Sequence, residues 1–561
     1  MNKDITEIWQ LYEKGKDFLD DLNLVNQTTQ NYRFYEGDHW HGLKSGGEKM
    51  PIVEIIKPII DYKTTILTQN ALKAVYNPMN YNISTTDYQM YREICNTLGE
   101  YFDKYWEINK MDTASFDVIK DALISGDSYM YLYYEDSNLK ENGTTVDGQV
   151  CQELVSNTNI MFGDENQCDI QKQPYILLLF RRTVESVKQK AKANGIAAKD
   201  IKRILPDDDR DQATGYTEEV KNDSKCLCIM KLWKENGTVH VMESTKNVIY
   251  RKDTDLGLTR YPIASYVWEN KHGLCRGVSD VQKYIPNQIW VNRLEAYRLI
   301  ATKMSAFPKL VYSSGVVNKD QIDAVGVALE VEETDISKAM EQVGYINPAP
   351  MSNDAKYVLD ELMTYTKDAA GASDIARGTD KLDNYSAVLA LQEAAKAPLA
   401  QQTMRFKMFI EDLAYILYDF WRNYFVEGLH IRNGEDMVVV GNEQLKKMRI
   451  SIKVDVTPTS PFNKLTEQQK LDNLVMNKLI SFEEFAMLVP DDDPMKIRLN
   501  MVLEARQAMQ MQQAAMQNEM MAYQEALDMS QAENIQKEQQ IAEAFNIGIN
   551  DAAIAEAATK E

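Results

Sequence analysis

Neighbouring carboxylates are the commonest feature of this sequence that could do chemistry, because two acidic side chains can hold a metal ion for phosphodiester hydrolysis. The chain has 84 acidic residues, so pairs are expected without any function, and most of them form solvated surfaces. An acidic, metal-dependent DNA-processing enzyme therefore stays an alternative interpretation. The pairs that come into question are Glu332-Glu333, Glu411-Asp412 and Glu483-Glu484.

Histidine and cysteine are too few and too scattered to predict a metal centre. His39 and His41 are the closest pair among five histidines, and packing of Trp40 between them under a turn is the simpler interpretation. Cys226 and Cys228 alternate with apolar residues, which favours a strand over half of a zinc site with its usual C-x2-C spacing. Six cysteines in 561 residues make no disulfide framework, which is typical of a protein made in a reducing cytosol.

The common sequence signatures of catalysis are missing from this sequence. It contains no G-x-x-x-x-G-K-[ST] phosphate loop, no G-x-S-x-G nucleophile turn, no H-E-x-x-H motif and no dinucleotide-binding glycine pattern. The aspartates at 207–209 lack the glycine and distal glutamate of a calcium-binding loop. We therefore expect no enzymatic activity, no catalytic or metal-binding residues and no cofactor.

A net charge of −22 argues against a protein that grips nucleic acid through excess lysine and arginine. This negative charge is compatible with a protein that lets DNA pass without binding it tightly. No apolar run reaches the roughly 18 residues of a membrane-spanning helix, and the N-terminal residues carry charges where a signal peptide has its apolar region. We therefore expect a soluble protein without a membrane partner.

Apolar spacing predicts an α+β fold in which helix predominates. Ile5–Leu22 has the spacing of an amphipathic helix, and a polar break and an aromatic-rich segment with glycine turns follow it. A second helix is expected to start near Pro58, and two further helices precede a strand at Ser128–Tyr134. The buried side of the second helix is expected to consist of Ile59, Ile60, Thr64 and Leu67.

A strand-rich region and two long helices fill the middle of the chain. Between residues 142 and 268, short apolar runs are separated by turns such as Asn236-Gly237. A long helical pattern at 277–304 stops before Phe307, and another helix is expected at 352–370. The candidate packing positions of the first of these helices are Ile289, Leu294, Tyr297, Ala301 and Met304.

A glycine-punctuated polar loop after Gly371 runs into a long helical pattern that ends near Gly428. The first half of this pattern is rich in alanine, leucine and glutamine, and Pro398 is expected to kink it. The second half is expected to bury one apolar face. That face consists of Phe406, Phe409, Ile410, Leu413, Ile416, Leu417, Phe420 and Trp421.

After Gly428 the pattern returns to strand, and from residue 462 onward it predicts helix. Asp493 before Pro494 has the residue types of a helix N-cap and first turn. Residues 501–530 hold seven of the 27 methionines, in a glutamine-rich helix whose distal end is expected to fray.

The order of these elements resembles the portal proteins of tailed bacteriophages, the head-to-tail connector family. Three segments carry the resemblance over nearly the whole length: NYRFYEGDHW followed by IIKPIIDYKTTIL, then GVSDVQKYIPNQIWVNRLEAYRL, then GASDIARGTDKLDNYSAVLALQEAAKAPL. None is a chemically required motif, so the resemblance rests on their combination and order. It implies a multi-domain portal fold that assembles as a ring, usually a dodecamer, at one capsid vertex.

The resemblance also implies a division of the chain into regions. An α+β wing is followed by two stem helices that flank a clip, then by a tunnel loop, a long kinked helix with further wing strands, and a helical crown. These regions are the wing (1–270), stem helix 1 (277–304), the clip (305–351), stem helix 2 (352–371), the tunnel loop (372–386), the kinked helix and strands (387–458) and the crown with the C-terminal tail (460–561).

By resemblance, the protein is a non-enzymatic conduit for double-stranded DNA during genome packaging and ejection. The implied partners are further copies of the chain, the large terminase, head-completion or adaptor proteins at the clip, and the major capsid and scaffolding proteins. The chain would be made in the host cytoplasm and reside in the virion at the portal vertex. Twelve stem helices about 10 Å apart give a circumference of about 120 Å and a bore of roughly 27 Å, which admits a duplex.

The implied tunnel loop carries two cations, Arg377 and Lys381, and the resemblance implies that they touch DNA phosphates transiently. Asp374, Asp380 and Asp383 are expected to limit that grip, and pairing of both cations with these aspartates is the alternative. A helical scaffolding or tail-assembly protein is a further alternative for the whole chain. It explains the methionine- and glutamine-rich end but not the strand-rich middle.

Overall fold

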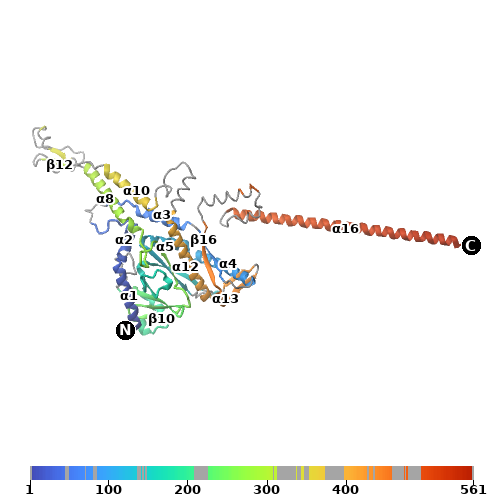
Figure 1. Cartoon of the computed structure of the whole chain (residues 1–561), viewed down its shortest axis with the longest axis horizontal. Coiled ribbons are helices and arrows are strands. Elements are labelled where there is room, and N and C mark those ends of the chain that lie inside the picture. Colours follow the sequence, from blue (N-terminus) through green and yellow to red (C-terminus); the bar gives the residue numbers. More distant parts are fainter. Residues whose placement is uncertain are drawn as a thin grey trace. The chain divides into compact units, whose positions relative to one another are not determined.

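The chain divides into two compact units, Met1–Ser460 and Pro461–Glu561. Helices predominate and antiparallel sheets accompany them, so the predicted α+β class is confirmed. Figure 1 shows the elements of both units in chain order. The computed structural model describes residues 3–43, 50–69, 71–79, 85–135, 140–141, 144–145, 148–207, 225–306, 309–312, 337, 343–346, 353–372, 397–425, 429–433, 436–457, 473, 476–477, 485 and 494–558.

A five-stranded antiparallel sheet, of order β10-β9-β8-β7-β6, contributes to two hydrophobic cores. Helix α1 (Lys3–Asp21), which the sequence predicts, packs Ile8 and Leu19 against Leu177 on one face. Because side chains alternate along a strand, Ile176 faces the other side and joins the main core. The strands are β6 (Ile160–Phe162), β7 (Tyr175–Thr183), β8 (Lys225–Glu235), β9 (Thr238–Ser244) and β10 (Ile249–Asp255).

A three-stranded sheet, of order β11-β2-β5, packs against helices α5 and α12. All eight apolar residues predicted to form the buried face of α12 are buried. Tyr266 of β11 meets Phe406 and Phe409 of α12 edge to face, with ring centroids 5.9 and 6.3 Å apart. The elements are α5 (Met111–Ser125), β2 (Asp127–Glu135), β5 (Gln149–Ser156), β11 (Ile263–Val267) and α12 (Ala400–Tyr424).

Strands from opposite ends of the first unit pair with each other. β1 (Ala71–Pro78) and β16 (Ile450–Thr457) form an antiparallel pair, on which helix α4 (Thr85–Ile108) packs. The ring of Tyr76 lies 6.4 Å from that of Trp421, so α12 shares this core. Nearby elements are β14 (Leu429–Asn433), β15 (Asp436–Val440) and α13 (Asn442–Lys447).

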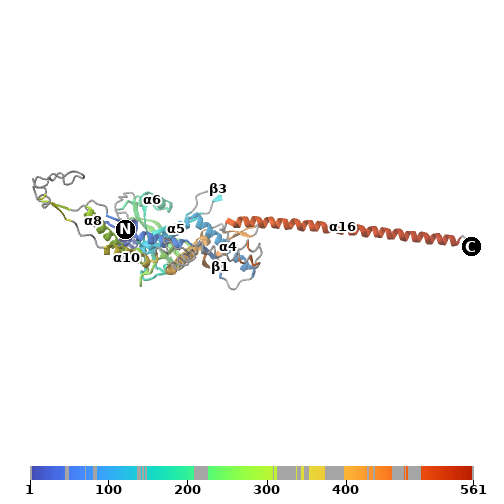
Figure 2. The same ribbon diagram turned by 90° about the horizontal axis from the view of Figure 1, so that it is seen from above.

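Two helices, α8 (Val281–Ala306) and α10 (Asn353–Ala369), lie side by side in Figures 1 and 2 and form what is here called the α8–α10 hairpin. Strands β12 (Lys309–Tyr312) and β13 (Val343–Ile346), between them in the chain, pair antiparallel. Helix α8 ends directly before Phe307, as the sequence predicts. The helices that pack against the start of α8 are α2 (Leu24–Glu36), α3 (Ile56–Thr68) and α5.

Short elements complete the first unit. Asn236 and Gly237, with φ of 53° and 90°, form the predicted two-residue turn between β8 and β9. Pro398 lies in a 3-10 turn directly before α12, and the preceding residues 373–396 fall outside the described part, so the kink stays a prediction. The short elements are β3 (Lys140–Glu141), β4 (Thr144–Thr145), η1 (Asn157–Asn159), η2 (Ile170–Lys172), α6 (Val184–Ala193), α7 (Ala198–Ile201) and η4 (Ala397–Leu399).

The second unit contains one long helix, α16 (Pro494–Ala558), which begins with proline at its first position as predicted. The helix extends to Ala558, and fraying of its distal end stays a prediction. Met511 and Met520 in it are largely exposed. Among the helices of the described residues, none combines the length and the apolarity needed to cross a bilayer.

Two sequence predictions about helices are wrong. The segment after Leu22, expected to be a polar break followed by turns, forms helix α2 after Asn23, which takes a positive φ of 52°. In α8, Tyr297 and Met304 were expected to be packed, but both are more than half exposed. The buried face of α8 is instead formed by Val281, Tyr284, Ile285, Gln288, Val291, Asn292 and Ala296.

Candidate functional site: the anchored α8–α10 hairpin

The residues proposed to line a DNA channel all fall within residues 373–396, outside the part of the chain that the structure describes. Their contacts therefore stay a prediction. The structure does describe both ends of this segment, at the end of α10 and at the start of α12. The five residues concerned are Asp374, Arg377, Asp380, Lys381 and Asp383.

The two ends of that segment meet at one place. Helix α10 ends in a Schellman motif, in which Ala372 N donates to Lys367 O at 2.9 Å and Gly371 N donates to Asp368 O at 2.9 Å. Gly371 has a φ of 69°, which explains the glycine. A Cβ placed on Gly371 would lie 3.9 Å from the ring of Pro398. The chain therefore leaves the hairpin and returns to it at the same point.

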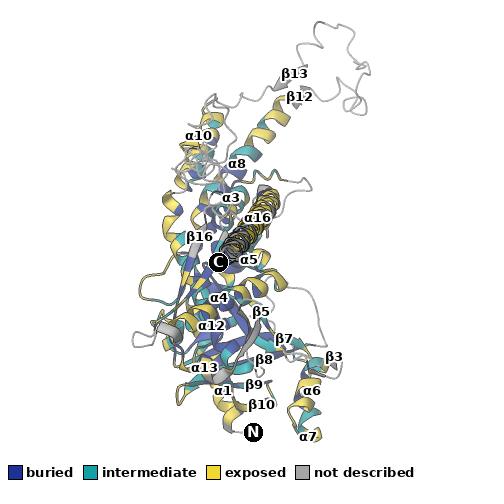
Figure 3. Cartoon of the chain, turned by 90° about the vertical axis from the view of Figure 1, so that its right-hand side faces the viewer, coloured by how far each residue is buried: buried dark blue, intermediate teal, exposed yellow. Residues whose placement is uncertain are grey.

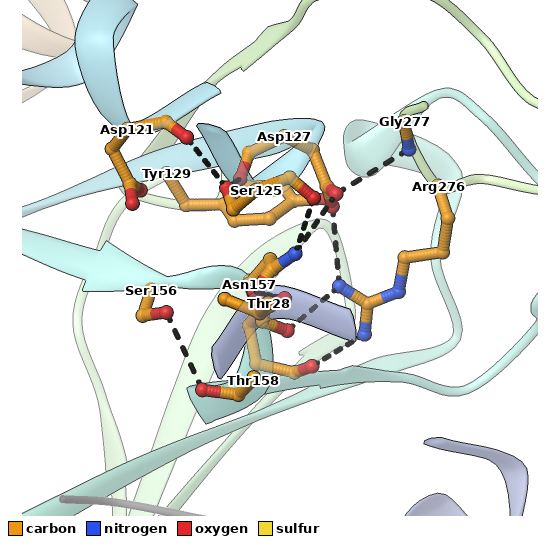
Figure 4. Close-up of polar contacts among 11 residues, drawn as sticks. Thr28, Asp121, Ser125, Asp127, Tyr129, Ser156, Asn157, Thr158, Arg276 and Gly277 are labelled. Atoms are coloured by element: carbon orange, nitrogen blue, oxygen red, sulfur yellow. Dashed lines mark hydrogen bonds and ion pairs between the residues drawn. The ribbon is translucent and has the colours of Figure 1, made fainter. Parts of the chain in front are cut away.

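The start of α8 is fixed by Arg276, a fully buried cation shown in Figure 4. Its Nη1 donates to Asp127 Oδ2 at 3.2 Å and to Asn157 O at 3.0 Å, while Nη2 donates to Ile160 O at 2.6 Å. Burial alone lowers the pKa of Arg276, but the neighbouring Tyr129 and Asp127 outweigh it and raise that pKa. The planar guanidinium thus ties the segment before α8 to two sheets.

Asp127 is the acceptor at the centre of this cluster, and it is fully buried at the start of β2. It accepts hydrogen bonds from Tyr129 Oη, from Asn157 Nδ2 at 3.4 Å and from Gly277 N at 3.4 Å, in addition to Arg276. Asn157 in turn donates to Ser125 O at 3.0 Å. Figure 4 shows these groups converging from α5, β2, η1 and the chain before α8. Arg276 and Asp127 therefore pair with each other as opposite charges, which offsets the desolvation of both.

Two glycine backbones cross directly above this cluster. A Cβ on Gly277 would lie 1.9 Å from Gly126 O, and a Cβ on Gly126 would lie 2.8 Å from Gly277 C. Gly126 also has a φ of 108°, which favours glycine. No other residue type fits this crossing without a shift of the backbone, so the turn from α5 to β2 and the start of α8 are in close contact.

A second buried ion pair holds the first turn of α8. Lys63 Nζ of α3 lies 2.6 Å from Asp280 Oδ2, and both side chains are almost fully buried. Tyr284 Oη, one turn along α8, accepts from the same ammonium group at 3.2 Å. Ser279 Oγ donates to Ile124 O at 2.6 Å and accepts from Gln282 N at 3.3 Å, which caps α8. These contacts join α8 to α3 and α5.

Further along, α8 caps the start of α3. Helix α3 has no capping side chain of its own at Ile55. Gln288 Oε1 accepts from Ile55 N at 3.0 Å, and Gln288 Nε2 donates to Val53 O. Asn292 Oδ1 accepts from Val53 N at 3.0 Å. The free backbone groups at this helix end are thus satisfied by side chains more than 230 residues away in sequence.

His39, one of the two histidines noted in the sequence, belongs to this structural network. His39 Nε2 bonds to Phe34 O at 2.8 Å and His39 Nδ1 to Asn292 Nδ2 at 2.9 Å. Burial lowers the pKa of His39, which keeps the ring neutral and lets Nδ1 accept. Trp40 Nε1 donates to Pro51 O at 2.9 Å, as expected of a tryptophan packed under a turn.

Helix α8 also carries large apolar side chains on the face opposite to its buried one. At 100° per residue, Trp290, Tyr297 and Met304 lie within about 40° of one another, on the far side from Gln288. All three are more than half exposed. Figure 3 shows exposed residues along α8 and α10 beyond the buried base of the hairpin. The exposed apolar stripe consists of Trp290, Tyr297, Ile300 and Met304 on α8, and α10 adds Tyr357, Val358 and Tyr365.

No protein-family model matches this chain, and no curated protein matches it significantly. What the site can do therefore follows from its own geometry. The polar groups at the base of the hairpin, Arg276, Asp280 and Gln288, are buried and bonded to neighbouring elements, which suits holding a helix in place. Among the described residues, the one group of three possible metal ligands lies elsewhere, on the five-stranded sheet.

Proposed function

We propose that this chain is a portal protein of a tailed bacteriophage: a non-enzymatic subunit of a ring at one capsid vertex, through which double-stranded DNA is packaged and ejected. The observation that carries the proposal is the α8–α10 hairpin. It is fixed at its base by buried polar contacts and is apolar on the face turned away from the core. Its place in the chain matches the two stem helices implied by the resemblance.

A second copy of the chain is the partner that best fits the apolar stripe. A helix that is apolar on opposite faces is stable only when both faces are covered. One face of α8 is covered by α2, α3 and α5, and the other carries Trp290, Tyr297 and Met304. In a ring every subunit contacts its neighbours through the same two surfaces. The apolar stripe of each subunit would therefore be covered by a surface of the next subunit.

The charge and the loop agree with a conduit. A net charge of −22 per subunit disfavours tight binding of DNA, so a duplex passes without being held. The segment that contains Arg377 and Lys381 starts and ends beside Gly371, at one end of the hairpin. We propose that these two cations contact DNA phosphates in passing.

The region around β12 and β13, at the other end of the hairpin, is the proposed docking site for terminase and adaptor proteins.

The proposal is tested by the assembly state of the purified chain. We expect rings in negative-stain images and a multiple of the 64.3 kDa subunit mass by light scattering. The double variant Tyr297→Glu/Met304→Glu should give folded monomers, because two carboxylates then stand in the stripe. The matched control is Ile108→Glu, which places one acid at an exposed apolar position of α4 and should still form rings.

Two results would overturn the proposal. One is a wild-type chain that stays monomeric at every concentration and salt condition. The other is a ring that forms equally well from the Tyr297→Glu/Met304→Glu variant.

The role of the loop is tested separately. The variant Arg377→Ala/Lys381→Ala should assemble normally but package or retain less DNA, and unchanged packaging would remove the role proposed for these two cations.

A further inference from the structure

Three possible metal ligands converge on neighbouring strands at one end of the five-stranded sheet. They are Glu235 at the end of β8, His240 in β9 and Asp253 in β10. One ligand atom from each residue lies within 4.8 Å of the other two. His240 is partly buried and both carboxylates are exposed, so their side chains can rotate towards a common point.

The strands hold these side chains close together without a metal. Trp233 stands opposite His240 in the β8–β9 register, with ring centroids 5.5 Å apart, and its indole Nε1 donates to Glu235 Oε2 at 3.4 Å. The tight turn at Asn236-Gly237 brings Glu235 back beside β9. One tryptophan therefore positions two of the three ligands.

The third ligand is positioned by an irregularity in β10. The pairing of β10 with β9 shifts register between Arg251 and Thr254, which is where Asp253 stands. A bulge of this kind re-aims a side chain. Asp253 Oδ1 consequently lies 2.8 Å from His240 Nδ1, although Asp255 is the residue paired with His240 in the register.

The local charge favours a divalent cation. Glu235 and Asp253 lie beside the imidazole of His240, and Asp255 is paired with His240 in the register, which gives three carboxylates to one imidazole. Nearby Lys231 does not neutralise them, because its Nζ lies over the Trp233 ring at 5.3 Å and 3.5 Å from Glu7 Oε1. Imidazole nitrogen with carboxylate oxygen is a ligand set suited to zinc, whereas calcium and magnesium prefer oxygen alone.

We propose that Glu235, His240 and Asp253 form a zinc-binding site with one nitrogen and two oxygen ligands, and with the fourth position open to water or to a group of another molecule. Around a tetrahedral zinc with bonds of about 2.0–2.1 Å, ligand atoms stand roughly 3.4 Å apart, so the exposed carboxylates need to move by only about 1 Å. The site ties three strands together at the end of the sheet. It is independent of the ring, because it needs residues of one chain alone.

The test uses the full chain without an affinity tag, stripped of metal by a chelator. Zn²⁺ is titrated by calorimetry, and Co²⁺ is used as an absorbing probe whose visible bands report tetrahedral coordination. We expect one ion per chain. His240→Ala and, separately, Glu235→Gln should weaken binding by roughly tenfold or more, and circular dichroism checks that each variant is folded.

The chain offers a matched control at His41. His41 Nδ1 lies 3.1 Å from Asp38 Oδ2, so this is also an exposed histidine–carboxylate pair, but it belongs to no group of three ligands among the described residues. His41→Ala should leave the zinc affinity unchanged. Absence of stoichiometric binding, or equal affinity in wild type and folded Glu235→Gln and His240→Ala, would show that the three groups are only hydrogen-bonded neighbours.

Discussion

The two halves of α8 invert the usual arrangement of a surface helix. Its first half buries polar side chains, among them Gln288 and Asn292, and is preceded by buried Arg276 and Asp280. Its second half exposes Tyr297, Ile300 and Met304. Buried polar contacts are directional and fix the position of a helix, whereas an exposed apolar surface is stable only when another surface covers it. The buried polar contacts therefore fix the position of the hairpin, whereas its exposed apolar surface is left uncovered by the described part of the chain.

The largest effect is expected from removing the buried cation before α8. Arg276→Met leaves Asp127 charged and buried without its partner, which costs about 3–5 kcal/mol of the free energy of unfolding. Urea unfolding measures the loss. Arg293→Met, a change of the same kind at an exposed position of α8, should alter stability by less than about 0.5 kcal/mol. Similar losses in both variants would contradict the anchoring role of the buried cation.

The glycine crossing gives the next largest effect. Gly277→Ala places a Cβ 1.9 Å from Gly126 O, and the backbone shift that follows costs about 1–3 kcal/mol or more. The control is Gly99→Ala in α4, where the new Cβ stands at an ordinary 3.7 Å from Ala74 O. That change should stabilise the protein by roughly 0.5–1 kcal/mol, because glycine is unfavourable inside a helix. Opposite signs in the two unfolding midpoints are the expected result.

Removal of the side chain that caps α3 should have a smaller but clear effect. Gln288→Ala leaves Ile55 N and Val53 O without their partners, at a cost of about 1–3 kcal/mol. Gln282→Ala, at an exposed position of the same helix, should be nearly neutral. Hydrogen exchange should show faster exchange at the start of α3 in the first variant only. Unchanged exchange there would mean that water replaces the cap.

Acid should stabilise the folded state through Asp121, a buried residue of α5, by about 1 kcal/mol between pH 7 and 5. Burial raises the pKa of Asp121 to about 6, which outweighs the hydrogen bond that its carboxylate accepts from Tyr32. The folded state thus holds this proton more tightly than the unfolded state. The resulting stability is fully present below the ordinary pKa of 3.8 and is lost as the pH rises through about 6. Asp121→Asn should remove this pH dependence, and an unchanged difference between pH 5 and 7 would refute it.

The smallest effect on stability is expected at the exposed half of α8. Tyr297→Glu should change the free energy of unfolding of the monomer by less than about 0.5 kcal/mol, because the side chain is more than half exposed. The same variant should nevertheless lose assembly, as measured by sedimentation. A large loss of stability in the monomer would show that this half of α8 packs within its own chain, and the comparison would then fail.

Sequence reasoning predicts elements well where one face of a helix is apolar and the other is not. The aromatic face of α12, the buried side of α3 and the Asn236-Gly237 turn follow from spacing and turn chemistry alone. The same reasoning fails for α8, because apolar residues occur on both of its faces. The spacing therefore does not show which face is buried. It also misses α2, whose polar residues hide the buried Leu24 and Phe34.

The anchor could not be predicted from the sequence, for a different reason. Arg276 and Asp127 are ordinary charged residues in the sequence, and they are paired only because the fold brings together positions 149 residues apart. The same is true of Gln288 and the start of α3. One local signal was present near the start of the helical pattern at 277–304, since Ser279-Asp280 has residue types typical of a helix start. Glu235, His240 and Asp253 likewise lack a recognisable spacing, because a turn and a bulge bring them together.

The polar contacts along the first half of α8 have a mechanical consequence. Apolar surfaces in contact can slide past each other by small steps, but Arg276, Asp280 and Gln288 each bond to a fixed partner and must be released together before the helix can shift. We therefore expect a load on the far end of the hairpin to turn α3 and α5 with it as one body. Stiffness at this joint is set by a few hydrogen bonds, so removing one should lower the stiffness while the remaining bonds still prevent the helix from shifting.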